Sequence, residues 1–185
     1  MTENMFFDHK RLAHCGSNVI IGKTVRIRYP ELVFIGDNVI IDDFTYISTS
    51  LCLSQYVHIA AGSKLIGGRK AMISIGSFSS LAPNVVIAAG SDDYIGGIAS
   101  PLVPVQYKGN MQIGKIEIGN HCVVGANTTL LPNVKLDNGA AVGAQSLVKS
   151  DLDAWKLYAG IPAKFIKDRD KNKILAFENS FLSES

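Results

Sequence analysis

The chain has 185 residues, 18 basic and 16 acidic side chains, and a formal net charge of +2. This near balance gives no electrostatic reason for a nucleic-acid partner, and no apolar run approaches the ~18 residues of a membrane span. We therefore expect one domain with a substantial buried core and neither nucleic acid nor a membrane as a partner, and residues 1–4 do not resemble a secretory leader.

Aliphatic residues recur at every sixth position over most of the chain, from an early start at Cys15, Ile21 and Ile27. Fifteen of them form three strict ladders: Ile35, Ile41, Ile47, Leu53, Ile59 and Leu65; then Ile75, Leu81 and Ile87; then Ile118, Val124, Leu130, Leu136, Val142 and Val148. A six-residue period predicts short strands separated by corners, with the ladder side chains stacked inside a prism. Since one coil cannot bury its own apolar face, we expect five or six stacked coils.

Other positions of the period fit the corners of such a prism. Small or β-branched residues such as Thr45, Ser79 and Thr128 recur four places after a ladder residue. Gly, Asn and Asp tolerate the positive φ that tight corners need. Cys15 and Cys122 occupy repeat positions suited to small packed residues, which is typical of reduced thiols and indicates a cytoplasmic location. We expect His121 to be an exposed corner residue.

Breaks in the ladder are candidate functional segments. Extra residues occur at 29–30 and at 67–70, and 88–117 has no hexad register. Because long irregular loops in compact domains are usually functional, we interpret 88–117 as an arm that folds over a groove beside the prism. We assign 1–150 to the repeat domain and 151–185 to a C-terminal cap. Within this cap we expect a strand or turn at 155–167, a short amphipathic helix at 168–177 over the last coil, and frayed residues at 178–185.

Two segments add a family resemblance to the repeat pattern. The run IGNHCVVGA from Ile118 to Ala126 and the ending YAGIPAK from Tyr158 to Lys164 resemble the hexapeptide acyltransferases. The chain is most similar to sugar acetyltransferases of this family that use acetyl-coenzyme A. The resemblance implies an all-β solenoid, a left-handed parallel β-helix, assembled as a homotrimer with active sites between subunits. It also implies acetyl-CoA as cosubstrate, a small-molecule sugar or nucleotide-sugar acceptor and no metal.

The catalytic base differs from that of related galactoside and xenobiotic acetyltransferases, whose long loop supplies a His. Here the loop has Ser91 and Asp92, and no His lies between residues 88 and 117. His58 precedes the ladder residue Ile59, so it should face outward into an inter-subunit groove as a catalytic or acceptor-binding group. The alternative is an interface His paired with a carboxylate.

The loop supplies further acceptor-site candidates. Asp92 and Asp93 are candidates to orient the base or bind the acceptor, or else are ordinary turn acids. Ser91 and Tyr94 flank them and are candidate substrate-binding residues.

The resemblance also implies a coenzyme A site. Pantetheine would pass Ala126 and Ala144, whose small side chains allow a close approach to the backbone. Lys149, Lys164 and Lys167 match basic positions near the nucleotide end of the cofactor. Arg169 is a further candidate. The alternative interpretation of each of these cations is a solvated surface charge without a ligand.

Loss of the loop His weakens catalysis on a hydroxyl more than on an amine, since a sugar amine is partly a free nucleophile near neutral pH. We therefore predict N-acetylation of a nucleotide-linked amino-dideoxy sugar, such as a dTDP-amino-dideoxyhexose, for O-antigen or other surface polysaccharide. The alternative is sugar O-acetylation with His58 as general base. Three other readings fit less well: a γ-class carbonic anhydrase with His9 and His14 among its zinc ligands, a non-catalytic scaffold and a nucleotidyltransferase module.

Overall fold

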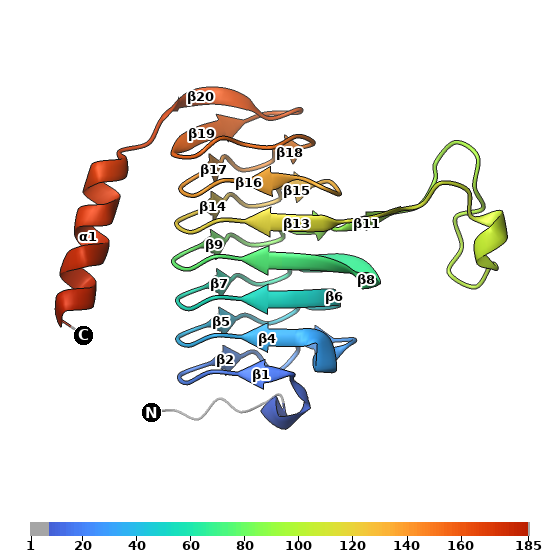
Figure 1. Ribbon diagram of the computed structural model, residues 1–185, viewed down its shortest axis with the longest axis horizontal. Coiled ribbons are helices and arrows are strands. Elements are labelled where there is room, and N and C mark those ends of the chain that lie inside the picture. Colours follow the sequence, from blue (N-terminus) through green and yellow to red (C-terminus); the bar gives the residue numbers. More distant parts are fainter. Residues whose placement is uncertain (1–7, 185) are drawn as a thin grey trace.

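A computed structural model describes residues 8–184 as a prism of stacked coils with an arm on one side and a helix on another (Figure 1). Residues 1–7 of the predicted repeat domain and Ser185 of the predicted cap lie outside the described residues. The prism is a left-handed parallel β-helix of about seven turns. It exceeds the five or six coils predicted because the register begins at Cys15 and continues past residue 150 to Leu152 and Tyr158.

Three faces form the prism. The first face contains β1 (His14–Cys15), β4 (Val33–Ile35), β13 (Lys115–Ile118) and β16 (Lys135–Leu136). The second contains β2 (Ile20–Ile21), β5 (Ile40–Ile41), β7 (His58–Ile59), β9 (Ser80–Leu81), β14 (Val123–Val124), β17 (Ala141–Val142), β19 (Lys156–Ala159) and β20 (Lys164–Asp168). The third contains β3 (Arg26–Ile27), β10 (Val86–Ala88), β15 (Thr129–Leu130) and β18 (Leu147–Val148).

Two long strands, β6 (Tyr46–Leu53) and β8 (Lys64–Ile75), run from the third face into the first and join the two into one ten-stranded sheet. Short 3₁₀ turns lie at η1 (His9–Arg11), η2 (Pro30–Leu32) and η3 (Val105–Tyr107). The remaining elements are the antiparallel pair β11 (Gly90–Ser91) and β12 (Gln112–Ile113), and the helix α1 (Lys171–Glu184).

The ladder residues form the core, as predicted. All fifteen are at most 3% exposed, and the strand register stacks them coil upon coil, as in Ile41 on Ile59 on Leu81. Buried hydroxyls at the small positions bond to backbone carbonyls: Ser79 Oγ donates to Gly119 O at 2.8 Å. Such bonds tie neighbouring coils together, so these small residues do more than fit the corners. The buried Oγ1 of Thr45 is an exception, because it makes no hydrogen bond.

One corner of the prism carries a column of stacked rings. Tyr56, Phe78, His121 and Trp155 all have φ between 56° and 58°, a conformation that the sequence assigned only to Gly, Asn and Asp. Ring centroids are 4.9 Å apart for Tyr56–Phe78, 5.3 Å for Phe78–His121 and 5.8 Å for His121–Trp155. Aromatic pairs at such separations attract each other, which offsets the unfavourable backbone geometry.

The arm extends away from the prism instead of folding over it as predicted (Figure 1). Its stalk is the antiparallel pair β11–β12, and the irregular part beyond exposes apolar side chains, among them Tyr94 at 90%, Ile95 at 99% and Leu102 at 96%. The two-stranded stalk explains the direction, because β11 and β12 pair with each other in an antiparallel sheet of their own. Such exposed apolar surface is typical of an interface with another chain.

The C-terminal elements differ in part from the prediction. β19 and β20 form the expected strand and turn. However, α1 runs along the side of the prism and does not cover its end, and it continues to Glu184 through residues predicted to fray (Figure 1). Phe181 explains both differences, because its ring packs against Phe78 and Tyr56 of the corner column. No helix in residues 8–184 is long and apolar enough to cross a membrane.

Candidate functional site

A groove of about 540 Å³ opens between the base of the arm and the C-terminal coils. It is lined by Ile66, Ala88, Gly90, Ser91, Asp92, Tyr94, Gln112, Leu131, Pro132 and Lys149. The structure thus brings together four residues that the sequence predicts for different parts of the site: Ser91, Asp92, Tyr94 and Lys149. The lining includes one carboxylate, Asp92, and one cation, Lys149, which suit a polar acceptor and an anionic cosubstrate.

A second groove of about 310 Å³ lies against the same arm base and reaches Gly67, Gly68, Pro101 and Lys108. The two grooves share Ile66, Gly90, Ser91, Asp92 and Gln112. Asp92 therefore lies where the two grooves join, so that a ligand in one groove would meet a ligand in the other there. This is the arrangement that direct transfer between two bound substrates requires.

Asp93 lines neither groove and holds the arm together. Its carboxylate accepts backbone N–H bonds from Ile95 at 2.9 Å, Gly96 at 3.1 Å and Asn110 at 2.9 Å. The bond from Asn110 contributes most, and together the three bonds hold the pKa of Asp93 below its usual range. Gly109 allows the Asp93 carboxylate to approach the backbone of the arm, because this residue adopts φ 65° and a Cβ there would collide with the carboxylate.

His58 faces outward from β7, as expected from its place before Ile59. Its Nε2 lies 2.8 Å from a carboxylate oxygen of Asp42, and the two side chains are 43% and 44% exposed. A carboxylate beside an imidazole orients the ring and fixes its tautomer. Within one chain, β7 belongs to the second face and the arm leaves the prism after β10 of the third face, so His58 and Asp92 are on different sides of the prism.

The other predicted cofactor residues lie along the C-terminal coils. Ala126 and Ala144 follow β14 and β17 at one corner, where the backbone N–H of Gln145 donates to the Ala126 carbonyl at 2.8 Å. Lys164 and Lys167 are exposed on β20. Arg169, in contrast, donates to the carbonyls of His121 at 2.8 Å and Gly139 at 2.6 Å, so its position is structural.

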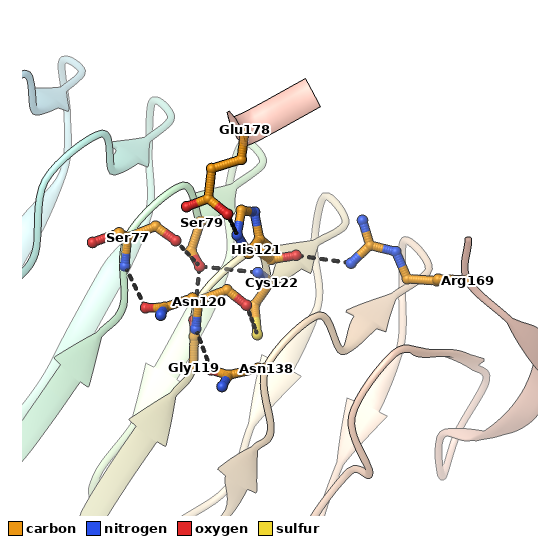
Figure 2. Close-up of polar contacts among 9 residues, drawn as sticks. All are labelled: Ser77, Ser79, Gly119, Asn120, His121, Cys122, Asn138, Arg169 and Glu178. Atoms are coloured by element: carbon orange, nitrogen blue, oxygen red, sulfur yellow. Dashed lines mark hydrogen bonds and ion pairs between the residues drawn. The ribbon is translucent and has the colours of Figure 1, made fainter. Parts of the chain in front are cut away.

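His121 is buried, contrary to expectation, with 9% of its surface exposed. Its Nε2 lies 3.0 Å from Glu178 of α1, and its backbone carbonyl accepts from Arg169 (Figure 2). The neighbouring Cys122 is also buried, as expected. Burial is the main cause that raises the pKa of this thiol to about 11. Both residues are therefore part of the packed corner of the prism.

Several neighbours of the site escaped the sequence analysis, among them Asp42 beside His58, and Gln112 and Pro132 in the first groove. The stacking of Ile41 on Ile59 would have placed Asp42 near His58, since Asp42 directly follows Ile41 and His58 directly precedes Ile59. Nothing in the sequence predicts Gln112, because its position depends on the pairing of β12 with β11. Among residues 8–184, no three His, Cys, Asp or Glu side chains converge to hold a metal ion.

Comparisons with known proteins identify the family, although no family model matches the chain. The chain is 36% identical over 170 residues to an Escherichia coli dTDP-4-amino-4,6-dideoxy-D-glucose acyltransferase, covering 90% of this chain and 86% of that protein. It also matches the structure of AntD, an N-acyltransferase from Bacillus cereus, in complex with dTDP and 3-hydroxybutyryl-CoA, with TM-score 0.91, 37% identity and 98% of each chain covered.

A cysteine variant of AntD, bound to dTDP-4-amino-4,6-dideoxyglucose and coenzyme A, matches with TM-score 0.90 and 38% identity, covering 95% of this chain and 92% of that chain. AntD is thus an N-acyltransferase that binds coenzyme A or an acyl-CoA together with dTDP or a dTDP-linked amino sugar, and the E. coli relative is an acyltransferase of the same amino sugar. The chain belongs to the hexapeptide-repeat acyltransferase family, in the group that contains the dTDP-4-amino-4,6-dideoxyglucose N-acyltransferases.

Proposed function

We propose that this protein transfers an acetyl group from acetyl-CoA to the amine of a dTDP-4-amino-4,6-dideoxyhexose, for surface polysaccharide. The observation that carries the proposal is the identity of 36–38% to N-acyltransferases of this substrate class over nearly the whole chain. The two grooves that meet at Asp92 agree with it, since each can hold one of the two substrates.

In this reaction the amine attacks the thioester carbonyl, the carbon–sulfur bond breaks and the coenzyme A thiolate takes the proton that the amine releases. Asp92 accepts a hydrogen bond from the amine and directs its lone pair toward the thioester. Asp93 holds the arm so that Asp92 stays in place, and Ser91 and Tyr94 contact the sugar. Pantetheine runs past Ala126 and Ala144 toward Lys149, Lys164 and Lys167, whose charges match its phosphates.

The active protein in this proposal is a homotrimer with sites between subunits. Two kinds of exposed apolar surface support it: the arm, with Ile95 and Leu102, and the second face, where Ile40 is 38% and Val123 42% exposed. Cyclic packing would set the arm of one subunit against the second face of the next and bring His58 toward Asp92. Sedimentation equilibrium should then give three times the mass of one chain.

We place the reaction in the cytoplasm, where reduced thiols such as Cys15, Cys52 and Cys122 persist. The test is thiol release from acetyl-CoA and from 3-hydroxybutyryl-CoA with dTDP-linked amino sugars and with plain glycosides. Turnover on the dTDP-linked amino sugar with acetyl-CoA supports the proposal. Turnover with the longer thioester alone corrects the acyl group, and turnover on glycosides alone contradicts N-acylation.

One observation favours a second candidate, sugar O-acetylation. Asp42 engages Nε2 of His58 at 2.8 Å, as expected for a carboxylate that orients a general base. The proton of a sugar hydroxyl would then pass to Nδ1. A product with a new ester, which hydroxylamine cleaves, would identify this reaction, whereas an amide resists hydroxylamine.

A further inference from the structure

Two short insertions in the repeat lie along the same corner of the prism as the arm. They are Tyr29–Pro30, after β3, and the segment 67–70, inside β8. The strands β3, β6, β8 and β10 pair in that order. Tyr29–Pro30 therefore lies three coils from the arm and segment 67–70 lies one coil from it, both on its N-terminal side. With strands about 4.8 Å apart, the far insertion is roughly 14 Å from the coil of the arm.

The insertions gather cations around one aromatic ring. Cζ of Arg28 and Cζ of Arg69 each lie 5.5 Å from the centroid of Tyr29. The corner between them contains only the small side chains at 48–50, so Arg69 reaches across the intervening coil. Since a tyrosine face attracts guanidinium groups, Tyr29 holds both cations at the surface. Lys70 follows Arg69 and is also exposed.

Within residues 8–184, the carboxylate of Glu31 contacts this cluster. Nη1 of Arg69 donates to Oε1 of Glu31 at 2.6 Å, while the Arg69 side chain remains 59% exposed. Three cations against one carboxylate leave the cluster positively charged. Two guanidinium groups in fixed positions suit a ligand with several phosphate oxygens, because each guanidinium can donate two parallel hydrogen bonds.

The second groove leads from Asp92 toward this cluster. It is lined by Gly67 and Gly68, the two residues before Arg69. Gly68 has φ 81°, and no atom lies within 4 Å of the position that a Cβ would occupy. A ligand can therefore approach the backbone here and extend from the arm base to the cations.

We propose that Arg28, Arg69 and Lys70 form the subsite for the diphosphate of the nucleotide-linked acceptor. The inference rests on the proposed function and adds an orientation to it. A 4-amino sugar carries its amine across the ring from the anomeric carbon that bears the diphosphate. With the amine at Asp92, the diphosphate extends along the second groove toward Arg69, and the acyl thioester enters from the first groove near Lys149.

The test is calorimetric binding of dTDP and, separately, of coenzyme A to four proteins: wild type, Arg69→Ala, Glu31→Gln and the control Lys135→Ala. Lys135 is an equally exposed cation on β16, on another face, and is paired with Asp137 at 2.7 Å. Arg69→Ala should weaken dTDP binding about 10–100-fold, the loss of a charged hydrogen-bonded pair, and leave coenzyme A binding unchanged. Lys135→Ala should bind both ligands as wild type does.

Glu31→Gln provides the sharper comparison, because it removes the carboxylate that competes for Arg69. Under the proposal it keeps or strengthens dTDP binding, whereas a merely structural ion pair predicts that Glu31→Gln weakens binding as Arg69→Ala does. Wild-type dTDP binding by Arg69→Ala, or a loss of coenzyme A binding instead, overturns the subsite and leaves the proposed function intact. Failure of the wild type to bind dTDP contradicts the proposed function itself.

Discussion

Nε2 of His121 lies 3.0 Å from a carboxylate oxygen of Glu178 and joins a corner of the prism to the C-terminal helix (Figure 2). The His121 carbonyl also accepts a hydrogen bond from Arg169, just before the helix. One residue therefore fixes both the start of this segment, through its backbone, and its middle, through its side chain. The side chains of His121 and Glu178 are only 10% and 23% exposed, so water screens the pair weakly.

Removal of the carboxylate should loosen the helix without unfolding the prism. For Glu178→Ala we expect a loss of about 1–2 kcal/mol of docking free energy, which corresponds to roughly 5–30-fold faster amide exchange in α1. Amides of the core strands should exchange as in the wild type. Glu184→Ala, at the exposed end of the same helix, is the matched control, and equal effects of the two substitutions would contradict the role of the pair.

The stability of the arm should depend on pH through Asp93. Hydrogen bonds from the backbone of Asn110, Ile95 and Gly96 lower the pKa of this carboxyl in the folded arm. A lowered folded pKa contributes stability that is complete above the ordinary pKa of an aspartate and is lost as the pH falls through the lowered value. Amide exchange at Gly96 and Asn110, corrected for its intrinsic rate, should therefore accelerate in acid.

Asp93→Asn should destabilise the arm at neutral pH as acid does in the wild type, because an amide oxygen accepts hydrogen bonds less strongly than a carboxylate. We expect faster cleavage of residues 94–110 by a protease and no change in prism unfolding. Asp92→Asn is the control, since the backbone N–H groups that hold the arm donate to Asp93 and not to Asp92. A protease-resistant arm in Asp93→Asn would show that other contacts hold it.

The six-residue period accounts for most of the fold because each ladder residue is buried by the same contact in every coil. Ile41 on Ile59 illustrates this, and the same stacking would have found the pair Asp42–His58. The period contains no information on segments that leave it. The direction of the arm follows from local β11–β12 pairing, and the position of α1 from contacts between residues far apart in sequence, such as His121 and Glu178.

Cys122 should resist alkylation in the folded protein. Burial raises its pKa to about 11, so at pH 8 only about one molecule in a thousand carries the reactive thiolate. Iodoacetamide at pH 8, followed by mass spectrometry, should label Cys52, which is partly exposed, well before Cys122. In denaturant the two cysteines should react at similar rates, and rapid native labelling of Cys122 would contradict the packing described.

Substitutions at His58 and Asp92 should separate acyl transfer to an amine from transfer to a hydroxyl. If the acceptor is an amine, His58→Ala should retain most of kcat, because the free amine needs no strong base. If the acceptor is a hydroxyl, loss of a general base should lower kcat about 10²–10⁴-fold. Steady-state rates of thiol release with dTDP-linked amino sugar as acceptor measure the difference.

Asp92→Asn completes this comparison, since it keeps the size of the side chain and removes its charge. We expect a loss of at least 10-fold in kcat with coenzyme A binding unchanged, because Asp92 orients the amine and contacts no phosphate. Asp42→Asn is the matched control on the other carboxylate, and for an amine acceptor it should behave as His58→Ala does. A full loss of activity in both His58→Ala and Asp42→Asn, with wild-type rates in Asp92→Asn, would assign proton transfer to the His58–Asp42 pair and reject Asp92 as the acceptor-orienting group.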